Sequence, residues 1–352
     1  MALERARLSI VVPVYNDPGN LAECLAALRA AMIPGCELIV VDDASPDDAS
    51  AAVARQAGAT VIRLEQNSGP AAARNRGVAA ATGDVVFFVD ADVAVAPDAV
   101  RRVSDAFEAS PELGAVFGSY DDTPRAPAMV SQYRNLLHHW VHQQGNEEAS
   151  TFWAGCGAVR RACFLEVGGF DAIRFRRPAI EDIELGYRLR RRGYRIRLDK
   201  QLQGKHFKGW TLGSVIRTDI QSRAIPWSRL ALEGGGAPND LNLKLGQRLS
   251  GILVLLALAA LTLAPLRPIF LWVAAAALAA VTVMNWPLYR FFLARRGVWF
   301  LARALPLHWL YYLYSSLTYL AIWIEVHGRR APRPVADRVP DPVPATPRRE
   351  RA

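Results

Sequence analysis

The amino-terminal part of the chain alternates between short apolar runs and segments with helical spacing. Runs of mostly β-branched or aromatic residues mark the expected strands LSIVVPVY (8–15), CELIVVDDAS (36–45), ATVIRLEQN (59–67) and DVVFFVDAD (84–92). Helices are expected between them at 21–32, 47–58 and 70–82. Such runs are typical of strands buried on both faces. This alternation predicts an α/β domain, a mostly parallel sheet flanked by helices. Residues 97–180 are less periodic and predict only mixed structure.

The pattern changes after about residue 240, where three long apolar stretches follow one another. Residues 249–266 carry no charge, residues 269–284 continue apolar, and residues 305–324 are uncharged and rich in Trp and Tyr. A helix that crosses a bilayer needs roughly 20 apolar residues. The first stretch meets this length, the second is slightly short, and the third is long enough but more polar. We therefore expect two or three transmembrane helices; the alternative is buried helices of a soluble core.

These changes predict four segments. We expect an α/β domain at 1–215, an amphipathic interfacial linker at 216–247, a membrane region at 248–326 and a disordered tail at 327–352. The linker is expected because aromatic and basic residues interleave just before and within it, as on a surface that lies on lipid. The tail is rich in Pro and Arg without periodicity, which favours disorder.

Charge and cysteine content narrow the partners. The 352-residue chain has a formal net charge of +9, and its basic residues cluster close to the apolar stretches. This placement favours anionic lipid headgroups over nucleic acid as the partner. The four cysteines form no CxxC pair, so neither a zinc site nor a disulfide framework is expected. No long apolar run precedes the first strand, so no cleavable signal peptide is expected.

Acidic pairs follow the apolar runs and suggest the chemistry. IVVDDAS ends a strand with Asp42 and Asp43, and FFVDADV ends another with Asp90 and Asp92. Open α/β sheets bind ligands in the crevice beyond the carboxyl ends of their strands. Paired carboxylates there suit a divalent cation and, through it, a diphosphate. The residues alone therefore predict a nucleotide-binding α/β domain.

Six motifs in order give the chain a family resemblance. They are SIVVPVYND, ELIVVDDASPDD, NSGPAAARNRGVAAATGD, FFVDADVAVAPD, GCGAVRRACFLEVGGFD and IEDIELGYRLRRRGY, and together they span roughly residues 8–200. In this order they resemble the inverting family 2 glycosyltransferases of GT-A fold. The resemblance implies a nucleoside-diphosphate sugar as donor, with a UDP-sugar favoured, and Mg²⁺ or Mn²⁺ as cofactor.

The resemblance implies donor-binding roles for five positions. Pro13 and Tyr15 would pack against the nucleotide base, and Asp43 would accept a hydrogen bond from a base N–H. Arg74 would meet the diphosphate or brace a carboxylate of the site. Asp90 would reach the ribose or the metal. The alternatives are an Asx turn with a helix cap for Asp43 and a solvated helix face for Arg74.

The same resemblance implies a metal site. Asp90 and Asp92 match the family's D-x-D element, whose oxygen ligands suit Mg²⁺ or Mn²⁺. The cation would neutralise charge on the departing nucleoside diphosphate. His206 is a candidate additional ligand, although a lone histidine is usually structural. A surface turn is the alternative for the two aspartates.

The catalytic residue implied by the resemblance is Asp182. As general base it would take the proton of the acceptor hydroxyl, with Glu181 in support. The alternative is that both acids favour a helix dipole. Gly155 and Gly157 match the segment that faces the donor sugar and acceptor, where glycine permits close backbone approach.

We therefore expect a membrane-anchored, non-processive enzyme that transfers one sugar to a lipid or lipid-linked glycan. Processive synthases of this superfamily carry Gln-x-x-Arg-Trp after the base, whereas only Gln221, Arg223 and a distant Trp227 occur here. The rivals are transfer onto a polyprenyl phosphate, a non-catalytic sugar-nucleotide-binding scaffold and a nucleotidyltransferase. The expected location is the inner membrane, spanned more than once, with the catalytic domain cytoplasmic. The positive-inside rule favours a hairpin that returns the arginines of 290–303 to that side.

Overall fold

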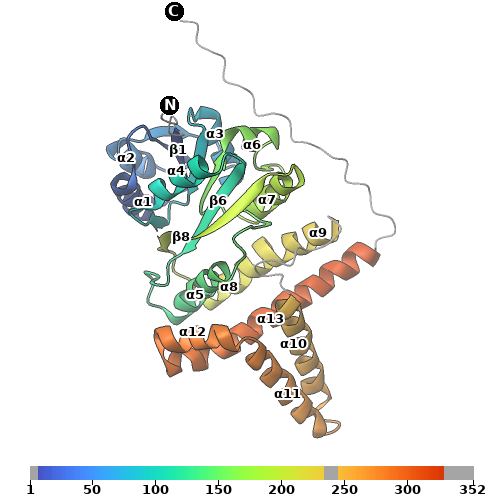
Figure 1. Ribbon diagram of the computed structural model, residues 1–352. Coiled ribbons are helices and arrows are strands. Elements are labelled where there is room, and N and C mark those ends of the chain that lie inside the picture. The colour runs from blue at the N-terminus through green and yellow to red at the C-terminus, as the bar shows by residue number, and fades with distance from the viewer. Residues whose placement is uncertain (1–6, 234–244, 329–352) are drawn as a thin grey trace, which may run out of the picture. The chain divides into compact units, whose positions relative to one another are not determined.

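The computed structural model describes residues 7–233 and 245–328, which form two compact units (Figure 1). The α/β unit comprises 7–126 and 145–208, and the helical unit comprises the described residues of 127–144 and 209–328. The expected tail (327–352) from residue 329 onward and part of the expected linker, 234–244, lie outside the described residues.

The α/β unit is built on one sheet of eight strands in the order β3-β2-β1-β4-β7-β6-β8-β5. Its strands are β1 Leu8–Val14, β2 Glu37–Asp42, β3 Thr60–Arg63, β4 Val85–Val89, β5 Val93–Val95, β6 Leu113–Tyr120, β7 Cys156–Arg160 and β8 Arg195–His206. Its helices are α1 Pro18–Ala31, α2 Ala49–Gln56, α3 Pro70–Ala80, α4 Ala99–Ala109, α6 Arg161–Glu166 and α7 Glu181–Arg191.

The first half of this sheet confirms the alternation predicted from the sequence. Strands β3, β2, β1 and β4 are neighbours and all parallel, and α1, α2 and α3 connect them. The second half is mixed, because β7 runs antiparallel between β4 and β6, while β6 pairs in parallel with β8. The prediction of an α/β sheet flanked by helices is therefore confirmed, but the sheet is mixed, because only its first half is all parallel.

The sheet is buried on both faces, as its apolar strands require. Alternate residues of one strand enter two separate cores; Ile10 and Val12 of β1 belong to one, and Val11 to the other. Helix α3 lies close to β1, since a Cβ added at Gly77 would approach Val11 Cγ1 to 2.4 Å. Glycine at this position lets the helix that carries Arg74 lie against the sheet.

The helical unit contains one helix from the middle of the chain and a carboxyl-terminal series. Its elements are α5 Met129–Gln143, α8 Leu212–Thr218, the π-helix η1 Asp219–Ala224, α9 Ile225–Glu233, α10 Leu245–Leu263, α11 Ile269–Met284, α12 Trp286–Arg296 and α13 Val298–Gly328. α11 and α12 are bent by 70° at their junction, where the buried Asn285 donates to Ser250 Oγ at 3.0 Å.

Helix α5 belongs with the helical unit, although it lies between β6 and β7 in the chain. Its Tyr133 and Leu136 are buried in one cluster with Tyr289 and Phe292 of α12. An ion pair of 2.9 Å joins its Arg134 to Asp219 of η1. The continuous boundary expected at residue 215 would leave α5 in the first segment, whereas its apolar face packs on α12 and α13.

The described helices include one that is long and apolar enough to cross a bilayer, α10. A second candidate exists if the bent pair α11 and α12 forms one span. The third apolar stretch, 305–324, lies within α13, which does not pass the same test of length and hydropathy. By length and composition, the described helices therefore provide one candidate span, or two if the bent pair is a single span.

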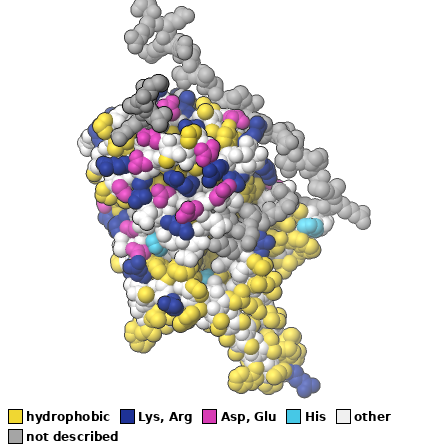
Figure 2. All heavy atoms as spheres, in the orientation of Figure 1, with side chains coloured by type: hydrophobic (Ala, Val, Ile, Leu, Met, Phe, Trp, Pro, Cys, Tyr) yellow, Lys and Arg dark blue, Asp and Glu magenta, His cyan; other side chains and the backbone are white. Residues whose placement is uncertain are grey.

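Exposed apolar side chains concentrate in the helical unit. Of the described large hydrophobic residues that are exposed, all but three lie between residues 245 and 326, and Trp272 and Trp299 are 75% and 78% exposed. On the face seen in Figure 2, hydrophobic side chains gather over the carboxyl-terminal helices, whereas most charged side chains lie on the α/β unit. Apolar surface of this extent marks contact with a membrane or a protein partner.

Candidate functional site

The carboxyl ends of the parallel strands carry the acidic and aromatic side chains predicted there. Tyr15 follows β1, Asp43 follows β2 and Asp90 follows β4. Because β1 lies between β2 and β4 and is parallel to both, these three strands end at one edge of the sheet. Asp92 precedes β5 by one residue. The strand order therefore gathers the acidic motifs at one edge of the sheet.

Arg74 of α3 connects two acidic motifs that are far apart in the sequence. Its Nη2 lies 2.6 Å from Asp90 Oδ1, and its Nη1 lies 2.8 Å from Glu181 Oε1, the first residue of α7. The side chains of Arg74 and Glu181 are each only 6% exposed. Arg74 therefore does not lie on a solvated face of α3. It holds two carboxylates in place.

The guanidinium of Arg74 stays charged in this setting. Burial opposes its charge, but the fields of Asp90, Glu181 and Asp182 outweigh burial and raise its pKa. Its Nε has no hydrogen-bond partner among the described residues, and its guanidinium carbon lies 5.6 Å from the centre of the Phe170 ring. Arg74 therefore supplies a permanent positive charge between the strand tip and α7.

Asp182 lies in the first turn of α7, next to the braced Glu181. Its Oδ1 accepts the backbone N–H of Ile183 at 2.8 Å, and its Oδ2 accepts that of Ala154 at 3.1 Å. Burial and the charge of Glu181 raise its pKa to about 7, although both hydrogen bonds and Arg74 act in the opposite direction. A carboxylate with this pKa can accept a proton at neutral pH, which an ordinary aspartate does poorly.

Asp92 is held by a histidine more than 100 residues further along the sequence, His206. Val93 pairs with His206 across β5 and β8, and His206 Nε2 lies 3.3 Å from Asp92 Oδ2. Burial opposes ionisation of Asp92, but the hydrogen bond and charge of His206 and the charge of Lys208 outweigh it and lower its pKa. The structure thus brings together Asp92 and His206, the two residues predicted as metal ligands with Asp90.

Two aromatic residues complete this side of the site, and the sequence pattern did not indicate them. Tyr120, the last residue of β6, stacks on His206 with ring centres 4.2 Å apart, and Trp153 meets Tyr120 edge-on at 4.8 Å. The stack follows from the pairing of Tyr120 with Gly204 of β8. An aromatic residue at the end of an apolar strand was the only signal available, and many core strands share it.

The carboxylates of Asp90 and Asp92 fit a divalent cation whose coordination shell is completed by oxygens of a bound substrate. Asp90 and Asp92 offer hard carboxylate oxygens, and their side chains stay 30% and 24% exposed. Of the two carboxylate oxygens of Asp90, Arg74 bonds to Oδ1. Among the described residues, no three His, Cys, Asp or Glu side chains form a ready-made metal cage. Mg²⁺ is commonly held by one or two carboxylates together with substrate phosphates, and this pair suits that mode.

The tips of β1 and β2 have an unusual backbone. Asn16 and Ala44 adopt positive φ angles of 49° and 59°, which cost a residue with a Cβ roughly 1–2 kcal/mol. Both oxygens of Asp43 accept backbone N–H groups at 2.8 Å, from Ser68 and Gly69. Asp43 therefore anchors the loop before α3, an interaction that the sequence did not predict. Burial raises its pKa.

The remaining predicted residues differ in exposure and environment. Pro13 is partly buried, while the Tyr15 side chain is 50% exposed beyond β1, as a residue that stacks on a ligand requires. Gly155 and Gly157 are enclosed by their own chain, since an added Cβ would meet the Trp153 ring at 2.5 Å and the Trp153 carbonyl oxygen at 2.2 Å. Gly155 also accepts the N–H of Asp90 through its carbonyl oxygen at 3.1 Å.

Comparisons with known proteins support the family resemblance of the motifs. Residues 9–168 match the model of glycosyl transferase family 2. The chain is 28% identical over 175 residues to an uncharacterized glycosyltransferase of Haemophilus influenzae, a match covering 47% of this chain and 56% of that protein. It is 29% identical over 202 residues to the pre-mycofactocin glycosyltransferase of Mycobacterium tuberculosis, covering 54% and 41%. The matches thus span about half the length of these relatives.

A solved structure agrees with the fold over nearly the whole chain. It is a mannosyltransferase from Pyrobaculum calidifontis in complex with GDP-Man and Mn²⁺. The similarity covers 93% of this chain and 89% of that one, with a TM-score of 0.55 and 21% sequence identity. At this identity the likeness establishes the fold, and the α/β unit has the GT-A fold predicted from its motifs.

Proposed function

We propose that this protein transfers one sugar from a nucleoside-diphosphate donor to an acceptor hydroxyl with inversion, since residues 9–168 match the model of glycosyl transferase family 2 and the α/β unit has the GT-A fold. The observation that carries the proposal is the bridge formed by Arg74. Arg74 binds both Asp90, at the tip of β4, and Glu181, which lies 107 residues after Arg74 in the sequence. This bridge brings Asp182, the neighbour of Glu181, close to the tip of β4. A base, a permanent cation and a carboxylate pair then share one site.

In the proposed reaction, Asp182 accepts the proton of the acceptor hydroxyl as its oxygen bonds to the anomeric carbon. The bond between that carbon and the diphosphate oxygen breaks, and the nucleoside diphosphate leaves with the electron pair. The transition state has oxocarbenium character, as in other glycosyl transfers. The pKa of Asp182, about 7, supports this role, because a general base works best when its pKa is close to the pH at which the enzyme operates.

A divalent cation held by Asp90 and Asp92, with His206 beside them, would neutralise charge on the departing diphosphate. Mn²⁺ and GDP-Man in the Pyrobaculum calidifontis enzyme support this cofactor and donor class. Arg74 would keep Asp90 oriented, and the exposed ring of Tyr15 would cover the nucleotide base with Pro13 beneath it. Asp43 would meet a base N–H while anchoring its loop. A UDP-sugar remains the favoured donor.

The exposed apolar helices support an acceptor at a membrane. We propose a lipid or a lipid-linked glycan, with the helical unit inserted through α10 and the bent pair α11–α12. The α/β unit would face the cytoplasm, where nucleotide sugars are made, and Gly155 and Gly157 would border the pocket for sugar and acceptor. The sequence after Asp182 lacks the Gln-x-x-Arg-Trp motif of processive synthases, which supports a non-processive enzyme.

A panel of UDP- and GDP-sugars, incubated with membranes that contain the protein, tests this function. The expected result is a product one hexose heavier than its acceptor, formed only with Mg²⁺ or Mn²⁺. Asp92→Asn should abolish metal-dependent donor binding in calorimetry, because it removes a hard anionic ligand. Unchanged affinity in this variant would remove Asp92 from the metal site, and donor binding without transfer or hydrolysis would favour a scaffold. A ladder of products would indicate a processive enzyme.

A further inference from the structure

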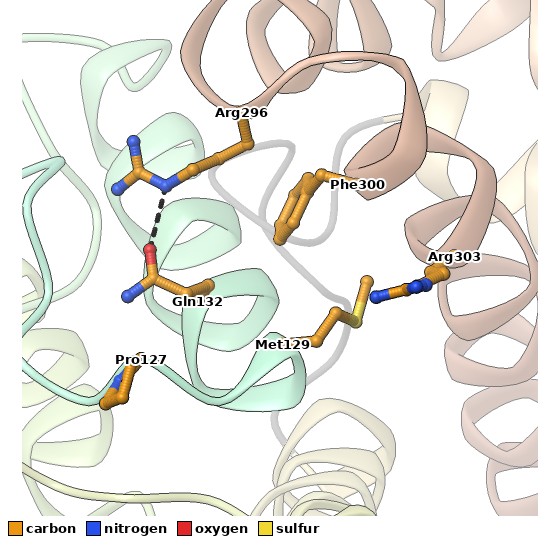
Figure 3. A pocket seen from close by; sticks show the side chains of 6 residues that line it. All are labelled: Pro127, Met129, Gln132, Arg296, Phe300 and Arg303. Carbon is orange, nitrogen blue, oxygen red and sulfur yellow. Dashed lines mark hydrogen bonds between the residues drawn. The ribbon is translucent and has the colours of Figure 1, made fainter.

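A hollow of about 450 Å³ opens on the helical unit and is lined only by residues of that unit. Three residues before or within α5 face three from α12 and α13 across it (Figure 3). They are Pro127, Met129, Gln132, Arg296, Phe300 and Arg303. None of them takes part in the proposed sugar transfer. The hollow is therefore a second candidate site in this molecule.

The polar lining of the hollow is cationic. Arg296 and Arg303 both border it, and none of the described residues that line it is acidic. Nε of Arg296 donates to Gln132 Oε1 at 2.8 Å (Figure 3), which orients the guanidinium plane. Arg303 is exposed and forms no ion pair within 7–233 and 245–328. Two guanidinium groups at one opening match the oxygens of a phosphate, which they can bind in a bidentate way.

The other lining residues, Pro127, Met129 and Phe300, are apolar. Exposed apolar side chains also lie close to the hollow in the sequence. Phe300 lies between the two arginines in Figure 3 and is 9% exposed. The chain turns at Gly297, with φ of 80°, and the next residues, Val298 and Trp299, are 61% and 78% exposed. An exposed tryptophan next to arginines is typical of the boundary between lipid and water. A ligand for this hollow therefore has an anionic head and an apolar body.

We propose that this hollow binds the phosphate headgroup of an acidic membrane lipid. The phosphate oxygens accept N–H groups of Arg296 and Arg303, and the first acyl carbons cover Phe300 and Met129. Basic pockets between membrane helices hold acidic headgroups in this manner. The site would hold the end of α12 and the start of α13 at the membrane surface. It rests on the membrane insertion proposed above but not on sugar transfer, since a failure here leaves sugar transfer intact.

Short-chain lipids with the full-length protein in neutral detergent test the proposal by calorimetry. We expect saturable binding of dihexanoyl phosphatidic acid, and a loss of about tenfold or more in affinity in the double variant R296Q/R303Q. Arg290→Gln is the matched control, because Arg290 is exposed on the same helix α12 and does not line the hollow. Its affinity should equal that of the unmodified protein.

Two further arms identify the ligand. Inorganic phosphate and dihexanoyl phosphatidylcholine should bind at least tenfold more weakly than dihexanoyl phosphatidic acid. If phosphate binds equally well, the ligand is not a lipid. If phosphatidylcholine binds equally well, the site does not select an acidic headgroup. Gln132→Glu keeps both arginines and adds a carboxylate beside Arg296, so it should weaken phosphatidic acid binding without lowering the melting temperature. Unchanged affinity for phosphatidic acid in Gln132→Glu or in R296Q/R303Q overturns the proposal. If R296Q/R303Q fails to fold, Gln132→Glu alone decides.

Discussion

At the scale of single residues, Asp182 has two candidate roles that one substitution separates. Asp182→Asn keeps the size of the side chain but removes the proton acceptor, so turnover should fall by about 10²–10⁴-fold. Donor affinity should stay unchanged, since Asp182 contacts only backbone N–H groups of its own chain. Initial rates with a hydroxyl acceptor and calorimetry with the donor measure the two quantities.

Glu184→Gln is the matched control, because Glu184 also lies in the first turn of α7 and pairs with Arg188. If the acids of this turn act only on the helix dipole, both variants should lose a few tenths of a kcal/mol of stability and keep their turnover. Near-normal turnover of Asp182→Asn would assign Asp182 to the helix. A modest loss would favour a polyprenyl phosphate acceptor, which is already ionised.

The raised pKa of Asp182 predicts a specific pH dependence. Because only the ionised form accepts a proton, kcat/KM for the acceptor should rise tenfold per pH unit below about 7 and level off above it. Stability changes in the opposite sense. The folded state holds this proton more tightly than the unfolded chain, so the stabilising contribution is complete below about pH 4 and is lost as pH rises to about 7. A rate profile without an inflection between pH 6 and 8 would contradict the assignment.

At the scale of elements, Arg74 ties α3, the end of β4 and the start of α7 together. Arg74→Met leaves Asp90 and Glu181 without their partner and should lower the free energy of unfolding by about 3 kcal/mol. This is the low end for a broken buried ion pair, because Asp90 is partly exposed. Arg76→Met, on an exposed position of α3, should change it by less than about 0.5 kcal/mol. Urea unfolding measures both. An unchanged stability with weakened donor binding would mean that Arg74 serves the diphosphate directly.

A second prediction at this scale concerns the seat of α7. Gly186 lies one turn after Asp182, and an added Cβ would meet Phe152 N at 2.4 Å. Gly186→Ala should therefore push α7 away from Ala154, whose N–H binds Asp182, and lower kcat more than donor affinity. Gly19→Ala is the control, since Gly19 in α1 has open space around its Cα and should gain up to about 1 kcal/mol from helix propensity. Equal kcat in Gly186→Ala and the unmodified enzyme would contradict this packing.

These elements also explain what the sequence could and could not predict. The strands up to Val89 and their acidic tips follow local apolar patterns, so β1 to β4 and the positions of Asp90 and Asp92 were predictable. The stack of Tyr120 on His206 depends on the register of β6 and β8, which no local pattern encodes. The same holds for the bonds from Ser68 and Gly69 to Asp43. Long-range pairing, rather than propensity, decides such contacts.

At the scale of the whole molecule, the described part of the chain passes between its two units three times, near residues 126, 144 and 208. The helix α5 that results from the first two passages buries Tyr133, Leu136 and Leu137 in the cluster of α12 and α13. A truncation after residue 241 removes α12 and α13 but keeps α5. Such a fragment should aggregate, because it exposes an apolar face that the intact chain covers.

The apolar surface of residues 245–326 predicts that the full-length protein stays with the membrane fraction. High salt and alkaline carbonate should not release it, because burial of apolar area, unlike charge attraction, is insensitive to both; detergent should. A chain that ends at Lys208, with 127–144 replaced by a Gly-Ser linker, should be soluble and still bind a nucleotide sugar with Mn²⁺, since Asp43, Asp90 and Asp92 all lie in the α/β unit. Sedimentation and calorimetry test the two halves separately. Full-length protein in the soluble fraction without detergent would contradict membrane insertion and would leave the exposed helices to a protein partner.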